Sequence, residues 1–303
     1  MSRENNHSHK QHVKNYNNAF AFGIILNVVY IIVEVVYGLI VNSMALIADA
    51  GHNFSDVLGL VLAWGASILA QKAATKTKTY GMRKATILAS LFNAIILLIA
   101  VGAISIESIR KLFQPEPVSG TSIMIVAVIG VFVNTITALL FLKGRKSDIN
   151  IKGAFLHMAA DAGVSLGVVV AGLLIYFTGW YLVDPIISLI IVVVITIGTW
   201  GLLRDSFSMS MDAVPKNVDF DGVEHYLQSL DGVVDVHDLH IWPMSTTETA
   251  LTVHLGVTKN VSTDKLIKLI ADKMQKDFDI VHVTIQTELE DRNDCKQKSE
   301  TAI

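Results

Sequence analysis

The sequence has little of two things that most soluble proteins contain. It has one cysteine, Cys295, so it can form no internal disulfide and has no Cys-x-x-Cys pair for metal binding. Charged residues make up 17% of the chain, against about 25% in an average soluble domain. The formal net charge of −3 is too small to favour a nucleic-acid partner. With 52% hydrophobic residues, these deficits indicate a membrane protein.

The apolar residues are gathered in six runs, each near or above the ~20 residues that span a bilayer core of ~30 Å. A removable signal peptide is not expected, because a polar stretch precedes the first run and no small-residue cleavage site follows a short apolar core. The six runs predict a membrane all-α bundle of six transmembrane helices. They lie at residues 19–41, 44–70, 84–109, 121–142, 153–177 and 181–203.

Basic residues are concentrated in two of the connections between these runs. The connections at 71–83 and 143–152 hold most of them, whereas those at 42–43 and 178–180 hold none. Because positively charged loops usually stay in the cytoplasm, we expect the two basic loops on that side. Both chain ends are then cytoplasmic too.

After the last run the pattern changes to that of a small soluble domain. Apolar residues at helical spacing predict two helices, and alternating apolar residues predict three strands, in the order α-β-β-α-β. This order predicts a compact ferredoxin-like α+β domain. The expected elements lie at residues 218–230, 233–242, 248–257, 263–278 and 280–289.

Only two of the ten histidines lie inside the apolar runs, and each is followed by an aspartate four residues later. The pairs are His52 with Asp56 and His157 with Asp161. Residues four apart share one helix face, so the two side chains of each pair can bind the same ligand. An aspartate at a helix centre costs roughly 2.5–3.5 kcal/mol on insertion, and intramembrane charges are usually functional. Two imidazoles and two carboxylates suit tetrahedral Zn²⁺ and disfavour Mg²⁺ or Ca²⁺.

Three further acidic residues lie in or beside the runs. Asp49, three residues before His52, is either a third carboxylate on the ion path or, as we prefer, a residue near the outer mouth. Glu34 is either neutral and hydrogen-bonded or faces a water-filled cavity. Asp184 precedes Pro185 at the start of the sixth run, where we expect it to cap that helix.

Together these motifs resemble those of the cation diffusion facilitators, a family of zinc transporters with six spans and a cytosolic C-terminal domain. The similarity covers about residues 15–290 of this sequence. It rests on residues 46–56, the pair His157 and Asp161, and the motifs Tyr80-Gly81-Met82-Arg83-Lys84, Pro115-Glu116-Pro117-Val118, Asp184-Pro185 and Val236-His237-Asp238-Leu239-His240-Ile241-Trp242.

The resemblance implies that the second and fifth spans face each other and that their two His–Asp pairs form one transport site. We therefore predict efflux of cytoplasmic Zn²⁺ in exchange for H⁺ by alternating access, with Cd²⁺, Co²⁺ or Fe²⁺ as alternative substrates. The predicted ligands are His52, Asp56, His157 and Asp161.

The resemblance also implies a metallochaperone-like C-terminal domain that pairs across a homodimer and binds regulatory zinc. His237, His254 and Glu288 match its ligand positions, although Glu288 replaces an aspartate and Gln286 stands where some members have histidine. His240 should face away from His237 if the strand is regular, because their spacing is odd.

Other features follow from the same comparison of motifs. Lys84 and Asp212 match positions that form an interlock near the membrane surface, and we expect His225 and His282 on the surface. The loop at 71–83 contains no His or Asp, so the second loop site of some bacterial members is not expected. Nor does the loop at 143–152 contain the histidines of animal members. The lack of this His-rich loop, the short loops and the compact length favour a bacterial inner membrane.

The predicted chain thus has four parts: a polar tail with histidines, a transmembrane domain, a cytosolic dimerisation domain and a disordered tail. The tail histidines His7, His9 and His12 either collect metal weakly or are simply solvated. The parts lie at residues 1–18, 19–205, 206–290 and 291–303.

Two other functions fit an intramembrane metal site: a membrane-bound metal sensor and an intramembrane metalloenzyme. The enzyme is disfavoured because the chain has no His-Glu-x-x-His motif and a four-ligand site leaves no position for catalytic water. A zinc flux assay would separate a sensor from a transporter. A channel is disfavoured because four strong ligands would hold zinc too tightly for fast conduction.

Overall fold

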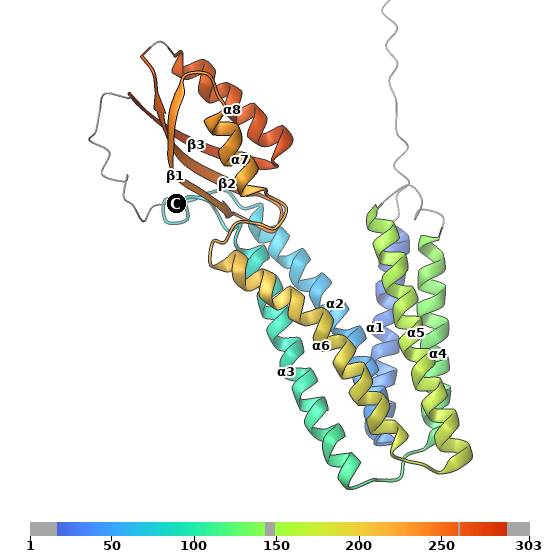
Figure 1. Ribbon diagram of the computed structural model, residues 1–303. Helices are drawn as coiled ribbons and strands as arrows, with labels where there is room; N and C mark the ends of the chain where they lie inside the picture. The colour runs from blue at the N-terminus through green and yellow to red at the C-terminus, as the bar shows by residue number, and fades with distance from the viewer. Residues whose placement is uncertain (1–16, 143–148, 260, 290–303) are drawn as a thin grey trace, which may run out of the picture. The chain divides into compact units, whose positions relative to one another are not determined.

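The computed structural model describes residues 17–142, 149–259 and 261–289. The tail histidines, the loop residues 143–148 and the C-terminal tail with Cys295 lie outside the described residues. Six helices precede a small α/β domain, which confirms the predicted fold class (Figure 1). The helices are α1 (Asn17–Ile40), α2 (Met44–Ala70), α3 (Ala85–Phe113), α4 (Gly120–Phe141), α5 (Ile149–Thr178) and α6 (Val183–Ser210).

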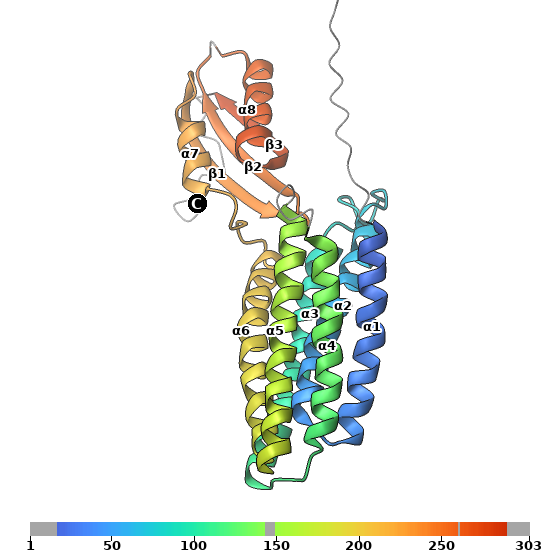
Figure 2. The same ribbon diagram turned by 90° about the vertical axis from the view of Figure 1, so that its right-hand side faces the viewer.

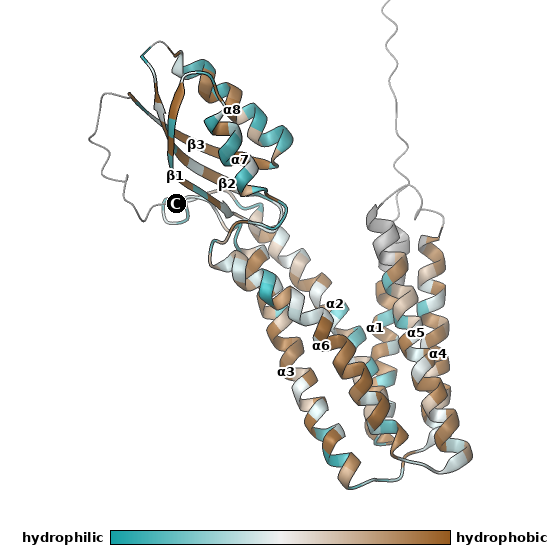
Figure 3. Cartoon of the chain, in the orientation of Figure 1, coloured by the Kyte–Doolittle hydropathy of each residue, from teal (hydrophilic) through white to brown (hydrophobic). Residues whose placement is uncertain are grey.

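Hydrophobic residues predominate in these helices, as the brown segments of the ribbon in Figure 3 show. Helices α2 to α6 are long and apolar enough to cross a membrane, and Ile24–Ile40 of α1 forms a shorter apolar helix. The predicted spans match them closely, with the largest difference at the end of α6. That helix continues past Arg204 to Ser210, because an apolar run marks the hydrocarbon boundary and not the end of the hydrogen-bonded helix.

Backbone contacts divide the chain into two compact units, which we describe separately. The first comprises Met1–Val57 with Ile99–Thr196, and the second Leu58–Leu98 with Ile197–Ile303. In the first unit α4 and α5 lie side by side (Figures 1 and 2). A Cβ atom on Gly172 of α5 would lie 2.8 Å from the backbone nitrogen of Met124 on α4. The two backbones therefore approach closely because this position has no side chain.

The N-terminus of α2 is capped by a side chain from another helix. Asp184, in the first turn of α6, accepts hydrogen bonds from the Ser43 hydroxyl at 2.5 Å and from the Met44 amide at 2.7 Å. The expectation that Asp184 caps its own helix is therefore wrong, because its carboxylate satisfies the free N–H groups of α2. The adjoining turn is held by Lys111, whose ammonium donates to the Asn42 carbonyl at 2.6 Å.

The second unit contains the C-terminal domain, a three-stranded sheet with two helices on one face. Strand β2 is central, antiparallel to β1 and parallel to β3, and α8 makes the crossover between β2 and β3. Apolar residues of both helices and of the facing sheet surface form its core. The elements are α7 (Phe220–Gln228), β1 (Val233–Pro243), β2 (Thr249–Val257), α8 (Thr263–Asp277) and β3 (Ile280–Leu289).

A β-bulge interrupts β1 in the middle of its histidine motif. His237 pairs with His254 of β2, yet His240 pairs with Thr252, so one extra residue lies between these pairs. Asp238 occupies the bulge with a φ of 52°, in the left-handed region. Both β1 histidines consequently lie on the sheet face away from the helices. The expectation that His240 faces away from His237, which assumed a regular strand, is wrong.

Candidate functional site

The two intramembrane His–Asp pairs meet across the gap between α2 and α5. His52 Nε2 lies 3.3 Å from Asp161 Oδ1, and His157 Nε2 lies 3.1 Å from Asp56 Oδ2. His157 Nε2 also lies 3.8 Å from Asp161 Oδ2 on its own helix. Each histidine thus faces the aspartate of the other helix, and the structure brings all four sequence-predicted residues together.

The carboxylate oxygens of this cluster have no hydrogen-bond donors apart from the two imidazoles. The Asp161 side chain is 1% exposed, and neither of its oxygens nor Asp56 Oδ2 accepts from a backbone, amide or hydroxyl group. Buried anionic oxygens with so few donors require a cation for compensation. Ligand atoms of His52, Asp56 and Asp161 lie within 4.8 Å of one another. Zinc bonds of about 2.0–2.2 Å place tetrahedral ligand atoms about 3.3–3.6 Å apart, so a closure of roughly 1 Å would suffice.

A second cluster lies on the open face of the C-terminal sheet, with one residue from each strand. His254 Nδ1 lies 3.1 Å from Glu288 Oε1, and His237 Nε2 lies 3.7 Å from Glu288 Oε2. The two imidazole centroids are 5.4 Å apart. Gln286 donates to Glu288 at 3.0 Å and so holds the carboxylate in place. The structure therefore brings together the three residues predicted for the cytosolic site.

Two aspartates of β1 adjoin this cluster, and sequence reasoning missed both. Asp235 Oδ2 lies 3.1 Å from His237 Nδ1, and Asp238 Oδ2 lies 3.7 Å from His254 Nε2. Asp238 Oδ1 also lies 3.0 Å from His240. In a regular strand Asp238 would point into the apolar core, where an unpaired carboxylate is unstable. That conflict was the available signal for an irregular strand.

The remaining sequence-predicted residues lie apart from both clusters. Lys84 and Asp212 form an ion pair at 2.6 Å, so the predicted contact is confirmed, while its role as an interlock stays a prediction. His225 and His282 are exposed as expected, and the rings of His282 and Tyr80 form a T-shaped pair with centroids 5.6 Å apart. Asp49 is fully buried, and its place near the outer mouth stays a prediction.

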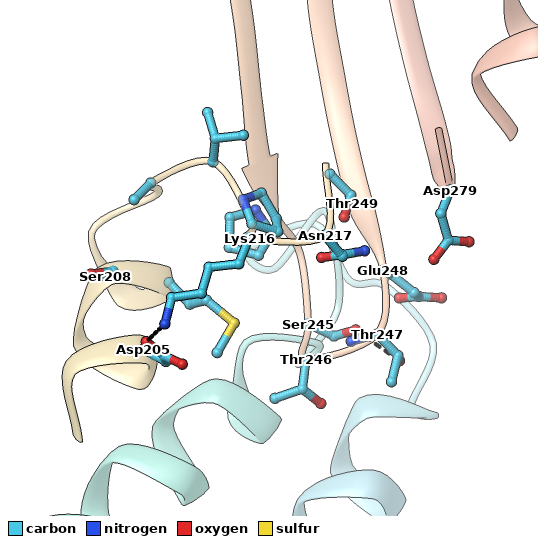
Figure 4. A pocket seen from close by; sticks show the side chains of 15 residues that line it. Asp205, Ser208, Lys216, Asn217, Ser245, Thr246, Thr247, Glu248, Thr249 and Asp279 are labelled. Atoms are coloured by element: carbon cyan, nitrogen blue, oxygen red, sulfur yellow. Dashed lines mark hydrogen bonds and ion pairs between the residues drawn. The ribbon is translucent and has the colours of Figure 1, made fainter. Parts of the chain in front are cut away.

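The second unit also contains a cavity of about 390 Å³ beside the C-terminal end of α6 and the turn between β1 and β2 (Figure 4). Lys216 pairs with Asp205 at 2.5 Å at its edge. Glu248 and Asp279 also line the cavity, but no lining residue belongs to a metal-ligand cluster of the described residues. The cavity is therefore not a candidate metal centre.

Comparison with known proteins gives a consistent result over most of the chain. A family model described as the cation efflux transmembrane domain matches residues 21–209, and one described as the cation efflux protein cytoplasmic domain matches residues 215–290. The cation efflux system protein CzcD of Alcaligenes sp. (strain CT14) is 35% identical, with 93% of this chain and 90% of the relative covered.

Two further relatives carry more specific names. The cadmium, cobalt and zinc/H(+)-K(+) antiporter of Bacillus subtilis (strain 168) is 33% identical, with 87% of this chain and 86% of the relative covered. The zinc transporter ZitB of Escherichia coli (strain K12) is 32% identical, with 93% of this chain and 91% of the relative covered.

Proposed function

Because the chain belongs to the cation efflux family, we propose that it exports Zn²⁺ from the cytoplasm in exchange for H⁺ by alternating access. Family membership makes it a multi-pass membrane transporter with a cytoplasmic C-terminal domain, and not an enzyme. The observation that carries the proposal is the crossed contact of two His–Asp pairs from α2 and α5. Of the described residues, His52, Asp56 and Asp161 form one of two candidate metal-ligand clusters, the one inside the transmembrane domain, and His157 adjoins it at 3.1 Å from Asp56.

The ligand chemistry supports zinc as the substrate. Two imidazole nitrogens and two carboxylate oxygens suit tetrahedral Zn²⁺, whereas Mg²⁺ and Ca²⁺ require six or more oxygens. Cd²⁺ and Co²⁺, which appear in the name of the Bacillus subtilis relative, can use the same donors. Fe²⁺ is a further possible substrate on the same grounds. Selectivity among these ions then depends on how tightly α2 and α5 close.

Proton exchange follows from the protonation states that metal binding requires. Zinc binds neutral histidine and ionised aspartate, so its arrival expels protons from the site. When zinc leaves, the two carboxylates repel each other and take up protons again. If α2 and α5 open alternately to the two sides, this cycle moves zinc one way and protons the other.

The cluster of His237, His254 and Glu288 supports a regulatory role for cytosolic zinc. It lies on the sheet face that α7 and α8 leave uncovered, and the matching family domain suggests a homodimer. Zinc bound there would favour whichever dimer arrangement holds it more tightly, because a ligand shifts states only through differential affinity.

The transport proposal can be tested in proteoliposomes with an internal zinc dye and an imposed pH gradient. His157→Ala and Asp161→Ala should each abolish zinc uptake, because the remaining ligands no longer complete a tetrahedron. The matched controls are His225→Ala and Asp221→Ala, which remove exposed side chains of α7. Parent-like uptake by either ligand variant would refute the site, and uptake indifferent to the pH gradient would refute proton exchange.

A further inference from the structure

A cluster of buried polar side chains in the first unit takes no part in the metal site. Glu34 of α1 and Asp49 of α2 are both 0% exposed, and their carboxyl groups are within hydrogen-bond reach of each other. The Tyr30 hydroxyl donates to Glu34 Oε1 at 2.8 Å, and the Ser165 hydroxyl of α5 donates to Asp49 Oδ2 at 2.9 Å. The Asn53 amide donates to the Asp49 carbonyl at 3.1 Å. The cluster therefore joins three helices.

The hydrogen-bond donors of this cluster are too few for two ionised carboxylates. Glu34 Oε2 is buried and accepts no hydrogen bond, and neither carboxylate forms an ion pair with a basic residue in the described part of the chain. Two buried negative charges without a cation would be strongly unstable. A single proton on Glu34 Oε2 removes one charge and gives this orphaned oxygen a partner, because it can then donate to the carboxylate of Asp49. The donor count therefore balances with one shared proton.

Close packing around the cluster favours a proton over a larger cation. On the side of α4, a Cβ atom on Gly130 would lie 2.1 Å from the Tyr30 hydroxyl and 3.1 Å from the Ser165 hydroxyl. The two hydroxyls thus occupy the space that a side chain of α4 would fill. The titratable groups around Glu34 are Tyr30 of α1, Asp49 of α2 and, through Asp49, the metal ligands His52 and Asp161.

The cluster lies beside the metal ligands on two helices. Asp49 precedes His52 by three residues on α2, and Ser165 follows Asp161 by four residues on α5, which is about one turn or ~5 Å in each case. Because the C-terminal domain is cytoplasmic, α2 runs from the outer side of the membrane to the cytoplasm. Helix α5 runs from the cytoplasm to the outer side. Both one-turn steps therefore lead from the metal site towards the outer side.

We propose that Glu34 and Asp49 form a proton-binding site that exchanges with the metal site. This proposal rests on the proposed function, since it names groups that carry an exchanged proton. Zn²⁺ bound one turn away repels the shared proton, which leaves Glu34 Oε2 for water. Release of zinc allows a proton from the outer side to return to the pair. By linkage, each ligand weakens the other by the same factor.

The experiment counts protons released per zinc bound. The full-length protein is titrated with zinc in weak buffer with a pH dye, in parent and Glu34→Gln forms. The amide keeps the shape and the Tyr30 contact but carries no exchangeable acid proton. We expect the variant to bind zinc in the parent's stoichiometry and to release about one proton fewer per zinc. Glu107→Gln, an exposed carboxylate near the end of α3, is the matched control and should release the parent number.

A second measurement on the parent protein avoids dependence on a variant that fails to fold. Infrared difference spectra should show the carbonyl stretch of a protonated carboxylic acid without zinc and its loss when zinc is added. Glu34→Asp, which keeps an acid, should retain the signal, and Glu34→Gln should lack it. A band that persists with zinc would overturn the proposal, because the proton would then be a fixed structural one.

The outcomes also separate this proposal from the transport mechanism. If the parent releases protons and Glu34→Gln releases as many, the pair is not an exchange site although zinc–proton exchange stands. If added K⁺ at constant pH displaces the infrared signal, the pair binds K⁺ and the proton assignment fails. If the parent itself releases no proton on binding zinc, both the exchange mechanism and this site are refuted.

Discussion

Among the individual side chains, the aspartates carry most of the meaning of this structure. Asp161 contributes carboxylate oxygens to the proposed metal site, Asp184 caps a helix, and Asp238 occupies a bulge beside the cytosolic histidines. The same residue type thus has three different roles. The surroundings of each carboxylate determine which role it has. The sequence predicted that His52 and Asp56 lie on one helix face, because residues at i and i+4 are neighbours on a helix.

Asp238 should strengthen zinc binding at the cytosolic cluster, because its carboxylate lies beside His254. Asp238→Asn should weaken zinc affinity by about 10-fold or more, the usual effect of losing an outer partner of a metal ligand. The measurement is calorimetric titration of the full-length protein with Asp161→Ala as background, so that only cytosolic sites respond. His240→Ala serves as the control, since its exposed ring contacts Asp238 and no predicted ligand. Equal losses in both variants would contradict this assignment.

The zinc affinity of the cytosolic cluster should also fall as the pH is lowered. Zinc binds neutral imidazole, so protons compete with zinc for His237 and His254. Zinc affinity should therefore fall as the pH is lowered, with a limiting slope of up to ~100-fold per pH unit because two protons compete. Replacing His254 with alanine should reduce that slope to about 10-fold. A slope unaffected by this change would exclude His254 as a ligand.

At the level of helices and strands, the transmembrane part depends on small residues and on one inter-helix cap. Gly172 allows α4 and α5 to touch through their backbones, and Asp184 of α6 holds the start of α2. The sequence predicted the helices themselves well, since an apolar run of membrane length has few other outcomes. It did not predict these contacts. A carboxylate before proline fits a cap on its own helix as well as one on a neighbour, and only packing decides between them.

Gly172→Ala should destabilise the transmembrane domain, because its Cβ would lie 2.8 Å from the Met124 nitrogen and 2.9 Å from the Gly120 carbonyl oxygen. Overpacking of this kind costs roughly 1–3 kcal/mol. The thermal unfolding midpoint in detergent should therefore fall. Gly167→Ala on the same helix is the matched control, since nothing lies within 4 Å of its Cβ position. If both alanines shift the midpoint equally, close α4–α5 contact is not the cause.

Asp184→Ala should also lower the unfolding midpoint, for a different reason. The change leaves the Ser43 hydroxyl and the Met44 amide buried without an acceptor, at about 1–3 kcal/mol for each unsatisfied group. Asp219→Ala removes an exposed cap on α7 and should cost less, about 1 kcal/mol. An Asp184→Ala effect no larger than that of Asp219→Ala would mean that the inter-helix cap contributes little.

For the protein as a whole, the sequence predicted the six helices, the αββαβ connectivity and the residues of both His-containing clusters that the structure brings together, while their role as metal ligands stays a prediction. The sequence did not predict three features that depend on contacts between segments. These are the bulge in β1, the capping of α2 by a side chain of α6 and the pairing of Glu34 with Asp49. Each failure involves a polar side chain whose partner lies far along the chain. Hydrophobic periodicity says which face of an element is buried, but not which polar group meets it there.

The bulge in β1 also determines which changes of length this domain can accept. Removing Asp238 alone would restore regular alternation without turning either half of the strand over, because His237 and His240 already share one sheet face. Leu239 and Ile241 would stay in the apolar core. Such a deletion would therefore keep the two surfaces of the sheet and would remove only the carboxylate that lies beside His254. Natural variants of this strand should accordingly include some that are one residue shorter and have no bulge between the two histidines.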